Sequence, residues 1–317
     1  MQATINRQIG FGGIGLHSGE PVTMRLFPEE ADCGVCFTRT DITDRNNRIS
    51  ATYDKVASTD LRTVIGNSDG VRVSTVEHIM AALAGTGIFN VRVEIDGPEV
   101  PIMDGSSEQF VQEILLAGVR QVDAPIRAIR ILEDVTVTKD DVTVSLSPSP
   151  GFEIDFYIEY ESEAIGTQTK SLNMANGAFV RELSLSRTFV EHADIPKVWA
   201  RGLGRGGSFA TTMVIAGPSV LNPEGFRYRD ECVRHKMLDA FGDLALAGAP
   251  ILGKFTGIKA GHSATNKLLR KLFSTPGAWD VVNCDEAMND LIPGYHIMVE
   301  DLRRDHEIGM DSHAGLH

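Results

Sequence analysis

The stretch DECVRHKMLDAFGDLALAG, residues 230–248, decides the fold. Advanced at about 100° per residue, it separates into a polar strip and an apolar half, which is typical of an amphipathic helix. The strip carries His235, Asp239 and Asp243, with Lys236 beside them. The apolar half must pack on a core, because burial provides most of such a helix's stability. His235 and Asp239 lie one turn apart, so they could be two ligands of a zinc ion if a third came from elsewhere in the chain.

Length and charge limit the class of protein. A chain of 317 residues exceeds the usual size of one hydrophobic core, so we expect two domains. The net charge of -13 argues against nucleic-acid binding, which needs clustered Lys and Arg. An anionic small substrate would require a local basic patch. No apolar run is long enough to cross a bilayer and no secretory signal is readable, so we expect a soluble, cytoplasmic protein without a transmembrane segment.

Two glycine-rich segments resemble a dinucleotide fingerprint. Residues 10–15 and 202–207 both read Gly-x-Gly-x-x-Gly. The fingerprint requires a helix N-terminus after the glycines, whereas both segments precede strand patterns. We therefore expect turns with positive φ at these glycines. His17 follows the first segment and could line a site, although a single loop histidine usually has no such role.

A second helix is predicted over residues 75–84. Ser74 and Glu77 have the spacing of a capping box, which gives Glu77 a purely structural explanation. His78 has no capping role. A carboxylate beside an imidazole at a helix start could instead provide a base and a metal ligand. Both interpretations of Glu77 stay open at this level.

His262 is expected in the first turn of a further helix, after the strand pattern ILGKFTGIKAG. A helix N-terminus destabilises an imidazolium, while a carboxylate such as Asp243 would stabilise it. A histidine between these influences could titrate near neutrality and donate a proton. The alternative is an exposed histidine without a role.

The order strands, helix, strand, helix restarts near residue 126. The segments around His78 and His235 are also weakly alike, which suggests two halves built on one plan. We therefore predict an α+β domain over residues 1–124 and another over 125–300. The second contains an insertion at about 190–217, and the polar tail 301–317 is predicted to be flexible.

Seven motifs occur in order between about residue 5 and about residue 300. They are IGLHSG at 14–19, STVEHI at 74–79, PIMDGS at 101–106, RTF at 187–189, VLN at 220–222, VRHKMLDA at 233–240 and GH at 261–262. Together they closely resemble the bacterial UDP-3-O-acyl-N-acetylglucosamine deacetylases, the zinc amidases of lipid A biosynthesis. Seven separated motifs in one order are very specific.

The resemblance implies a fold and a metal site. The fold would comprise two similar α+β domains, each a β-sheet layered with helices and each carrying a small insertion. The helices would pack face to face between the two sheets. His78, His235 and Asp239 would be the zinc ligands at the interface between the domains, with water as the fourth ligand.

The resemblance also implies catalytic roles. Glu77 would take a proton from the water that attacks the acetamido carbonyl of the sugar. Thr188, with the zinc ion, would stabilise the oxyanion. His262, oriented by Asp243, would protonate the leaving amine, with support of the oxyanion as its alternative role.

The implied partner is a UDP-linked acylated amino sugar. Lys236, which is also a candidate catalytic residue, and Lys259 would provide the basic patch for the diphosphate, and Phe189 would contact the substrate. The insertion would form an acyl passage. The residues implied to line it are Ile195, Gly207 and Val214.

The sequence leaves two other functions open. One is a zinc amidase acting on another acylated amino sugar, and the other is a non-catalytic sugar-nucleotide-binding protein with a structural metal. Glu77 and His262 argue against the second, because a closed structural site needs neither a base nor an acid. A monomer is expected, and weak contact with a membrane surface through the acyl passage stays an open alternative.

Overall fold

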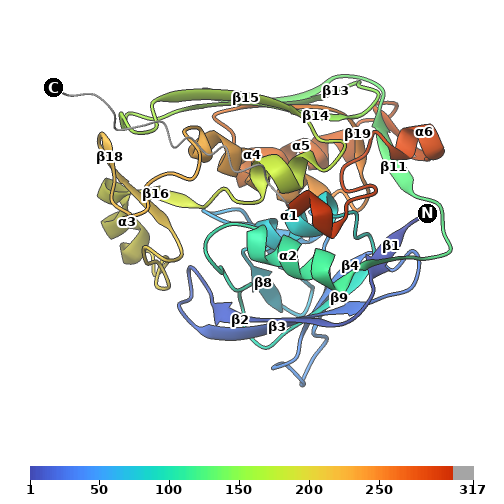
Figure 1. The fold of residues 1–317 in the computed structure, drawn as a ribbon, viewed down its shortest axis with the longest axis horizontal. Coiled ribbons are helices and arrows are strands. Elements are labelled where there is room, and N and C mark those ends of the chain that lie inside the picture. The colour runs from blue at the N-terminus through green and yellow to red at the C-terminus, as the bar shows by residue number, and fades with distance from the viewer. Residues whose placement is uncertain (303–317) are drawn as a thin grey trace.

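The structure is a computed structural model that describes residues 1–302. The molecule has its longer helices in a middle layer between two sheets, and its two short helices at the edges (Figure 1). The helices are α1 (Glu77–Gly85), α2 (Glu108–Ala117), α3 (Ile195–Ala200), α4 (Glu231–Ala245), α5 (His262–Ser274) and α6 (Glu286–Asn289). The predicted α+β fold, with helices packed face to face between sheets, is confirmed.

The sheet of the first half has the strand order β2-β3-β9-β4-β5. A smaller sheet, β6-β7-β8, follows it in sequence, and β1 pairs with β10. The strands are β1 (Ala3–Ile5), β2 (Ile9–Ile14), β3 (Pro21–Pro28), β4 (Val35–Arg39), β5 (Arg48–Ser50), β6 (Val56–Ser58), β7 (Val64–Gly66), β8 (Arg72–Ser74), β9 (Val91–Ile95) and β10 (Val119–Gln121). Exposed and buried residues alternate along β3, so its apolar side chains face α1 and α2.

The sheet of the second half contains β12-β13-β19-β14-β15, extended by β11 and β20 along one end of β19. A smaller sheet, β16-β17-β18, precedes α4. The strands are β11 (Arg127–Ile131), β12 (Val135–Lys139), β13 (Val142–Ser147), β14 (Phe152–Glu159), β15 (Thr167–Asn173), β16 (Phe189–Glu191), β17 (Met213–Ala216), β18 (Ser219–Val220), β19 (Ile251–Ile258) and β20 (Trp279–Asn283).

The two halves share one topology, as their weak sequence likeness predicts. In each half two hairpins flank a central strand, β9 or β19, which is antiparallel to one hairpin and parallel to the other. β19 also pairs in parallel with β11. A small sheet lies between the second hairpin and the helix that precedes the central strand. Helices α1 and α4 therefore occupy equivalent positions, and they pack against each other.

The crossing of α1 and α4 is unusually close. A Cβ atom added at Gly242 would lie 2.0 Å from the carbonyl oxygen of Glu77, so the two backbones touch at this point. Apolar residues of α1 such as Ile79 and Leu83 are almost fully buried, because the helix is covered by its own sheet and by α4. The contact brings the start of α1 beside the polar strip of α4.

Several local predictions need correction. Helix α1 begins at Glu77, not at residue 75, and the capping box does not form. Ser74 belongs to β8 and accepts a hydrogen bond from Arg62, while Thr75 turns the chain with a positive φ of 58°. The competing strand pairing thus overrides the capping signal.

The glycine prediction holds at one segment only. Gly10, Gly12 and Gly15 lack positive φ, and the first two lie in β2, so the expected turn there is wrong. In the second segment Gly202 and Gly204 have positive φ, whereas Gly207 does not. The insertion at about 190–217 contains β16, α3 and β17. Of the tail predicted to be flexible, Asp301 and Leu302 end a short 3-10 helix, and residues 303–317 lie outside the described part. No helix within residues 1–302 combines the length and apolarity that a bilayer span requires. The domain limits stay a prediction.

Candidate metal centre and active site

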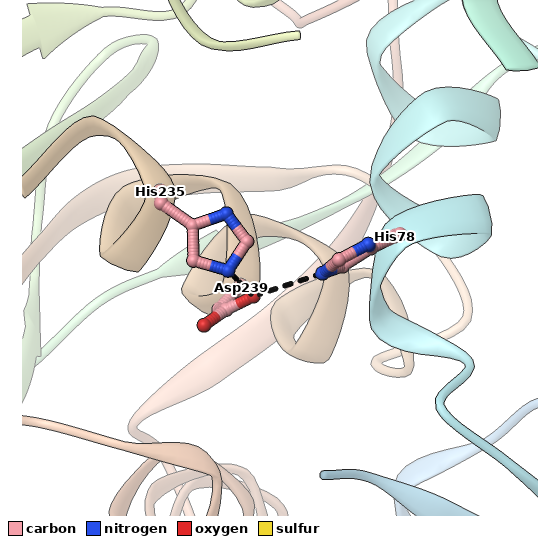
Figure 2. A group of neighbouring side chains, drawn as sticks. All are labelled: His78, His235 and Asp239. Atoms are coloured by element: carbon pink, nitrogen blue, oxygen red, sulfur yellow. Dashed lines mark ion pairs between the residues drawn. The ribbon is translucent and has the colours of Figure 1, made fainter. Parts of the chain in front are cut away.

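Three side chains converge where α1 crosses α4. Figure 2 shows His78 projecting from α1 toward His235 and Asp239 on α4. Asp239 Oδ1 lies 3.5 Å from Nε2 of His78 and 3.3 Å from Nε2 of His235. One donor atom from each residue lies within 4.8 Å of the others, and all three residues are buried. The predicted third residue therefore comes from the first half of the chain.

The chemistry of these residues fits a metal ion. His235 Nδ1 lies 3.0 Å from the carbonyl oxygen of Ser186, which can only accept, so Nδ1 carries the proton and the lone pair of Nε2 faces Asp239. Burial lowers the pKa of His235 to about 3, which keeps the ring neutral. A lone pair and a carboxylate that face each other repel unless a cation lies between them.

The charge state of Asp239 agrees with this interpretation. Burial would raise its pKa, but the positive charge of Lys236 acts against burial, and the pKa is held well below its usual range. Lys236 Nζ donates to Asp239 Oδ2 at 2.8 Å, leaving Oδ1 directed at the two imidazoles. The other ring nitrogen of His78, Nδ1, is buried without a hydrogen-bond partner among residues 1–302.

A second group, Glu77, Asp243 and His262, lies beside the first. His262 begins α5, as predicted, and its Nδ1 lies 2.7 Å from Asp243 Oδ2. Its Nε2 lies 3.8 Å from Glu77 Oε1. Thr63 joins the group, since its amide donates to Glu77 Oε2 at 3.1 Å and its hydroxyl donates to Asp243 Oδ1 at 2.5 Å. No sequence signal pointed to Thr63, because its partners lie in other elements.

Burial and charge shift the two titratable groups of this cluster in the same direction. Burial, reinforced by Asp243, raises the pKa of Glu77 to about 7 against the attraction of His262. Burial alone would lower the pKa of His262, but the carboxylates of Asp243 and Glu77 outweigh it and raise the pKa to about 9. Glu77 therefore changes protonation state near neutrality, while His262 holds a proton there.

Both groups open into a cavity of about 570 Å³. Of the predicted residues it is lined by Glu77, His78, Thr188, Phe189, His235, Lys236, Asp239, Lys259 and His262. Thr188 is fixed by its backbone, whose amide donates to Gly105 and whose carbonyl accepts from Met213. The ring of Phe189 lies edge-on to that of His235, with centroids 6.1 Å apart.

The predicted basic patch is largely neutralised. Lys236 pairs with Asp239, and Lys259 pairs with Glu159 at 2.7 Å and with Asp141 at 3.1 Å. Lys139 and Lys267 line the same cavity and were missed, because nothing in their local sequence separates them from ordinary surface lysines. His17 also lines the cavity. Its ring is buried, which lowers its pKa to about 4.

A second cavity of about 590 Å³ adjoins the first. Ile195, Gly207 and Val214 all line it, as predicted for the passage. The two cavities share five lining residues, which are Leu16, His17, Leu61, Thr188 and Phe189. The insertion that carries α3 forms one wall of this second cavity, and the shared residues connect that wall to the cavity that contains His78, His235 and Asp239.

The fold and the site together define a class of protein. Two equivalent α+β halves enclose a candidate metal centre next to a carboxylate and a histidine, an arrangement typical of metal-dependent hydrolases.

Comparison with known proteins narrows this class. The family model described as UDP-3-O-acyl N-acetylglycosamine deacetylase matches residues 2–274. A protein of Phenylobacterium zucineum named UDP-3-O-acyl-N-acetylglucosamine deacetylase is 46% identical over 88% of this chain and 96% of its own length. Relatives of the same name from Myxococcus xanthus (45% identity, 89% of each chain) and Pasteurella multocida (42% identity, 90% of this chain and 94% of the relative) agree. The chain belongs to this family, and it is a deacetylase.

Proposed function

We propose that this chain hydrolyses the N-acetyl group of UDP-3-O-acyl-N-acetylglucosamine, giving UDP-3-O-acyl-glucosamine and acetate, an early committed step of lipid A biosynthesis. The observation that carries the proposal is the convergence of His78, His235 and Asp239 beside Glu77 and His262 in one cavity. The names of the related proteins support the choice of substrate. Water adds to the acetyl carbon, the amide C–N bond breaks, and the nitrogen leaves with an added proton.

Zinc is the proposed cofactor, held by His78, His235 and Asp239. Two imidazole nitrogens and one carboxylate are a donor set that zinc takes in catalytic sites, with a further position left open. When bound, zinc lowers the pKa of water and polarises a carbonyl oxygen. Every other step falls to side chains of this chain.

Glu77 is the proposed general base. Its Oε2 is occupied by the amide of Thr63, and its Oε1 faces the cavity near His262. A pKa raised to about 7 lets the carboxylate accept a proton from a water molecule at neutral pH and pass it on. The structural explanation by a capping box no longer competes with this role, because that box does not form.

His262 is the proposed general acid. Asp243 occupies Nδ1, so the N–H of Nε2 is directed away from Asp243 toward Glu77. With its pKa raised to about 9, the imidazolium is populated at neutrality and can protonate the leaving amine. Thr188 would donate a hydrogen bond to the oxyanion that develops on the acetyl group.

The remaining predicted residues would bind the substrate. Lys236 and Lys259 lie on the wall of the first cavity and would face the diphosphate. Lys259 would first give up its ion pair with Glu159. Phe189 lines both cavities, so it would separate the sugar from the acyl chain. The acyl chain would follow the passage lined by Ile195, Gly207 and Val214.

Metal analysis combined with acetate release tests the proposal. The purified protein should contain about one zinc ion per chain and release acetate from the UDP-sugar. His78→Ala should lose both properties, and retention of both would contradict the proposal. Faster turnover of an acylated amino sugar without UDP would instead favour the alternative of a different amidase.

We also propose a cytoplasmic monomer that contacts a membrane surface weakly at the mouth of the passage. Four large apolar side chains on the wall of this cavity are exposed, namely Leu61 (46%), Trp199 (62%), Phe209 (50%) and Leu221 (39%). An apolar rim beside an acyl passage suits the interfacial region of a bilayer. Trp199→Ser should reduce co-sedimentation with phospholipid vesicles, whereas Val281→Ser, which removes another exposed apolar side chain, should not. Equal sedimentation of both variants would contradict the contact.

A further inference from the structure

A buried ion pair lies behind the metal-binding group and lines neither cavity. Arg187 is 2% exposed and Glu231 is 0% exposed. Nε and Nη2 of Arg187 donate to the two carboxylate oxygens of Glu231 at 2.9 and 3.1 Å. Such a two-point contact between planar groups fixes their relative orientation. No step proposed above uses either residue.

Each partner of the pair is adjacent to a functional group. Arg187 lies between Ser186, whose carbonyl accepts the hydrogen bond from His235 Nδ1, and Thr188. Glu231 lies four residues before His235 on α4, and therefore on the same face of that helix. The amide of Arg187 also donates to Glu231 Oε1 at 3.1 Å. The segment 186–188 is thus attached to one face of α4 at two points, one helical turn apart.

We infer that Arg187 and Glu231 are positioning residues, which hold the Ser186 carbonyl against His235 and hold Thr188 at the cavity wall. Backbone hydrogen bonds of Thr188 to Gly105 and Met213 fix one end of the segment. Without the ion pair, only the Ser186–His235 hydrogen bond would attach the segment to α4, and it could rotate about that bond relative to the helix. The second attachment removes that freedom and so fixes the ring orientation and the tautomer of His235. The inference rests on the proposed function, since that assigns the roles of His235 and Thr188.

The surroundings of the pair leave its orientation little freedom. Nη1 of Arg187 donates to Glu224 and Nη2 donates to the carbonyl of Gly225, both at 2.6 Å. The amide of Arg227 donates to Glu231 Oε2, also at 2.6 Å. A buried ion pair seldom stabilises a fold more than apolar residues of the same volume would. The contribution that we assign to this pair is therefore orientation: it fixes the Ser186 carbonyl against His235 and fixes the position of Thr188.

The deciding variant is Arg187→Lys, which keeps the positive charge and removes the fork of donors. Competition with a chelator at a temperature where the variant is fully folded would give its zinc dissociation constant. We expect zinc binding to weaken by about 10- to 100-fold, the usual effect of losing a residue that orients a ligand. At saturating zinc, kcat should fall more than KM changes, because Thr188 acts on the transition state.

Asp230→Asn is the matched control. It removes a 2.6 Å ion pair with Arg234 at the same end of α4, but Asp230 makes no hydrogen bond to residues 186–188. Zinc affinity should stay at the wild-type value in this variant. If Arg187→Lys does not fold, the double variant Arg187→Met/Glu231→Met replaces it, because it buries no unpaired charge. This double variant should show the same loss of zinc affinity.

The outcomes separate this inference from the proposed function. Wild-type zinc affinity and an unchanged kcat in whichever of the two variants folds would overturn the inference while the proposed function stands. A wild-type protein that neither binds zinc nor releases acetate would contradict the proposed function itself.

Discussion

At the scale of single residues, the site depends on two buried groups whose pKa values are raised for different reasons. Burial dominates at Glu77, where desolvation disfavours the carboxylate. At His262 burial acts the other way, and the neighbouring carboxylates of Asp243 and Glu77 outweigh it. One cluster therefore holds a group that can accept a proton and a group that can donate one at the same pH.

Replacing Glu77 by glutamine tests the base. The amide cannot accept the proton, so acetate release should fall on the order of 10²-fold or more while zinc content stays unchanged. Metal analysis and an acetate assay measure both quantities. Glu108→Gln, which alters a buried carboxyl outside the cavity, should keep near-normal turnover. Full activity in Glu77→Gln would remove Glu77 from the mechanism.

The raised pKa of His262 also predicts a pH dependence of stability in the metal-free protein. The folded chain keeps the proton up to about pH 9, whereas the unfolded chain releases it near 6.5. The folded state therefore binds more protons in this window, and its free energy of unfolding should fall as the pH rises through it, by about 3 kcal/mol at most. Glu77 adds a decrease of the same sign at lower pH, because its pKa rises from 4.5 in the unfolded chain to about 7 in the folded one.

Denaturant titrations between pH 7 and pH 9.5 measure this slope. His262→Gln has no titrating group at this position, so its free energy of unfolding should change less over the same range. Parallel slopes for the variant and the wild type would contradict the assignment.

At the scale of elements, the site exists because α1 and α4 touch backbone to backbone. Gly242 permits this contact, and its neighbours in sequence include Asp239 and Asp243. The opposite surface is the start of α1, which carries Glu77 and His78. A helix crossing at a larger distance would separate His78 from His235 and Asp239.

Gly242→Ala tests the crossing. The added methyl group would lie 2.0 Å from the Glu77 carbonyl, so the helices must move apart. We expect a loss of stability of about 1–3 kcal/mol or more, together with weaker zinc binding, because His78 moves away from Asp239. Denaturant unfolding and chelator competition measure the two effects. Gly12→Ala, where a Cβ atom meets nothing within 4 Å, is the control, and zinc affinity equal to that of the control would contradict the prediction.

At the scale of the whole molecule, the candidate metal centre lies where the two halves of the chain meet. His78 belongs to the first half and His235 to the second, and the halves repeat one topology. A ligand that binds only where the halves are correctly packed must stabilise that packing. Zinc bound at the proposed site would therefore link the halves as well as support the reaction.

Removing zinc should accordingly lower the thermal unfolding midpoint. At a zinc concentration of about 100 times the dissociation constant, the stabilisation is about 2.7 kcal/mol, which corresponds to a shift of about 4 °C for a chain of this length. Calorimetry with and without a chelator measures it. His78→Ala should abolish the shift, whereas His262→Ala should keep it because His262 is not one of the three ligands. An equal shift in His78→Ala would contradict a site shared between the halves.

The sequence alone determined the features that depend on local periodicity. The 3.6-residue repeat of α4 predicted its polar strip with His235 and Asp239, and the end of the strand pattern before His262 predicted the start of α5. The order of elements predicted two similar halves. Resemblance to a family, and not any rule of spacing, led to His78 as the third member of the group.

Only the tertiary structure decided which distant groups meet. Thr63, the carbonyl of Ser186 and the Arg187–Glu231 pair have no local signal, because hydrogen bonds between elements depend on how the elements pack. The same reason explains why the capping box at Ser74 is wrong: pairing with β7 holds Ser74 in a strand. Periodicity is a property of one segment, whereas the site arises from the contact of two helices at Gly242.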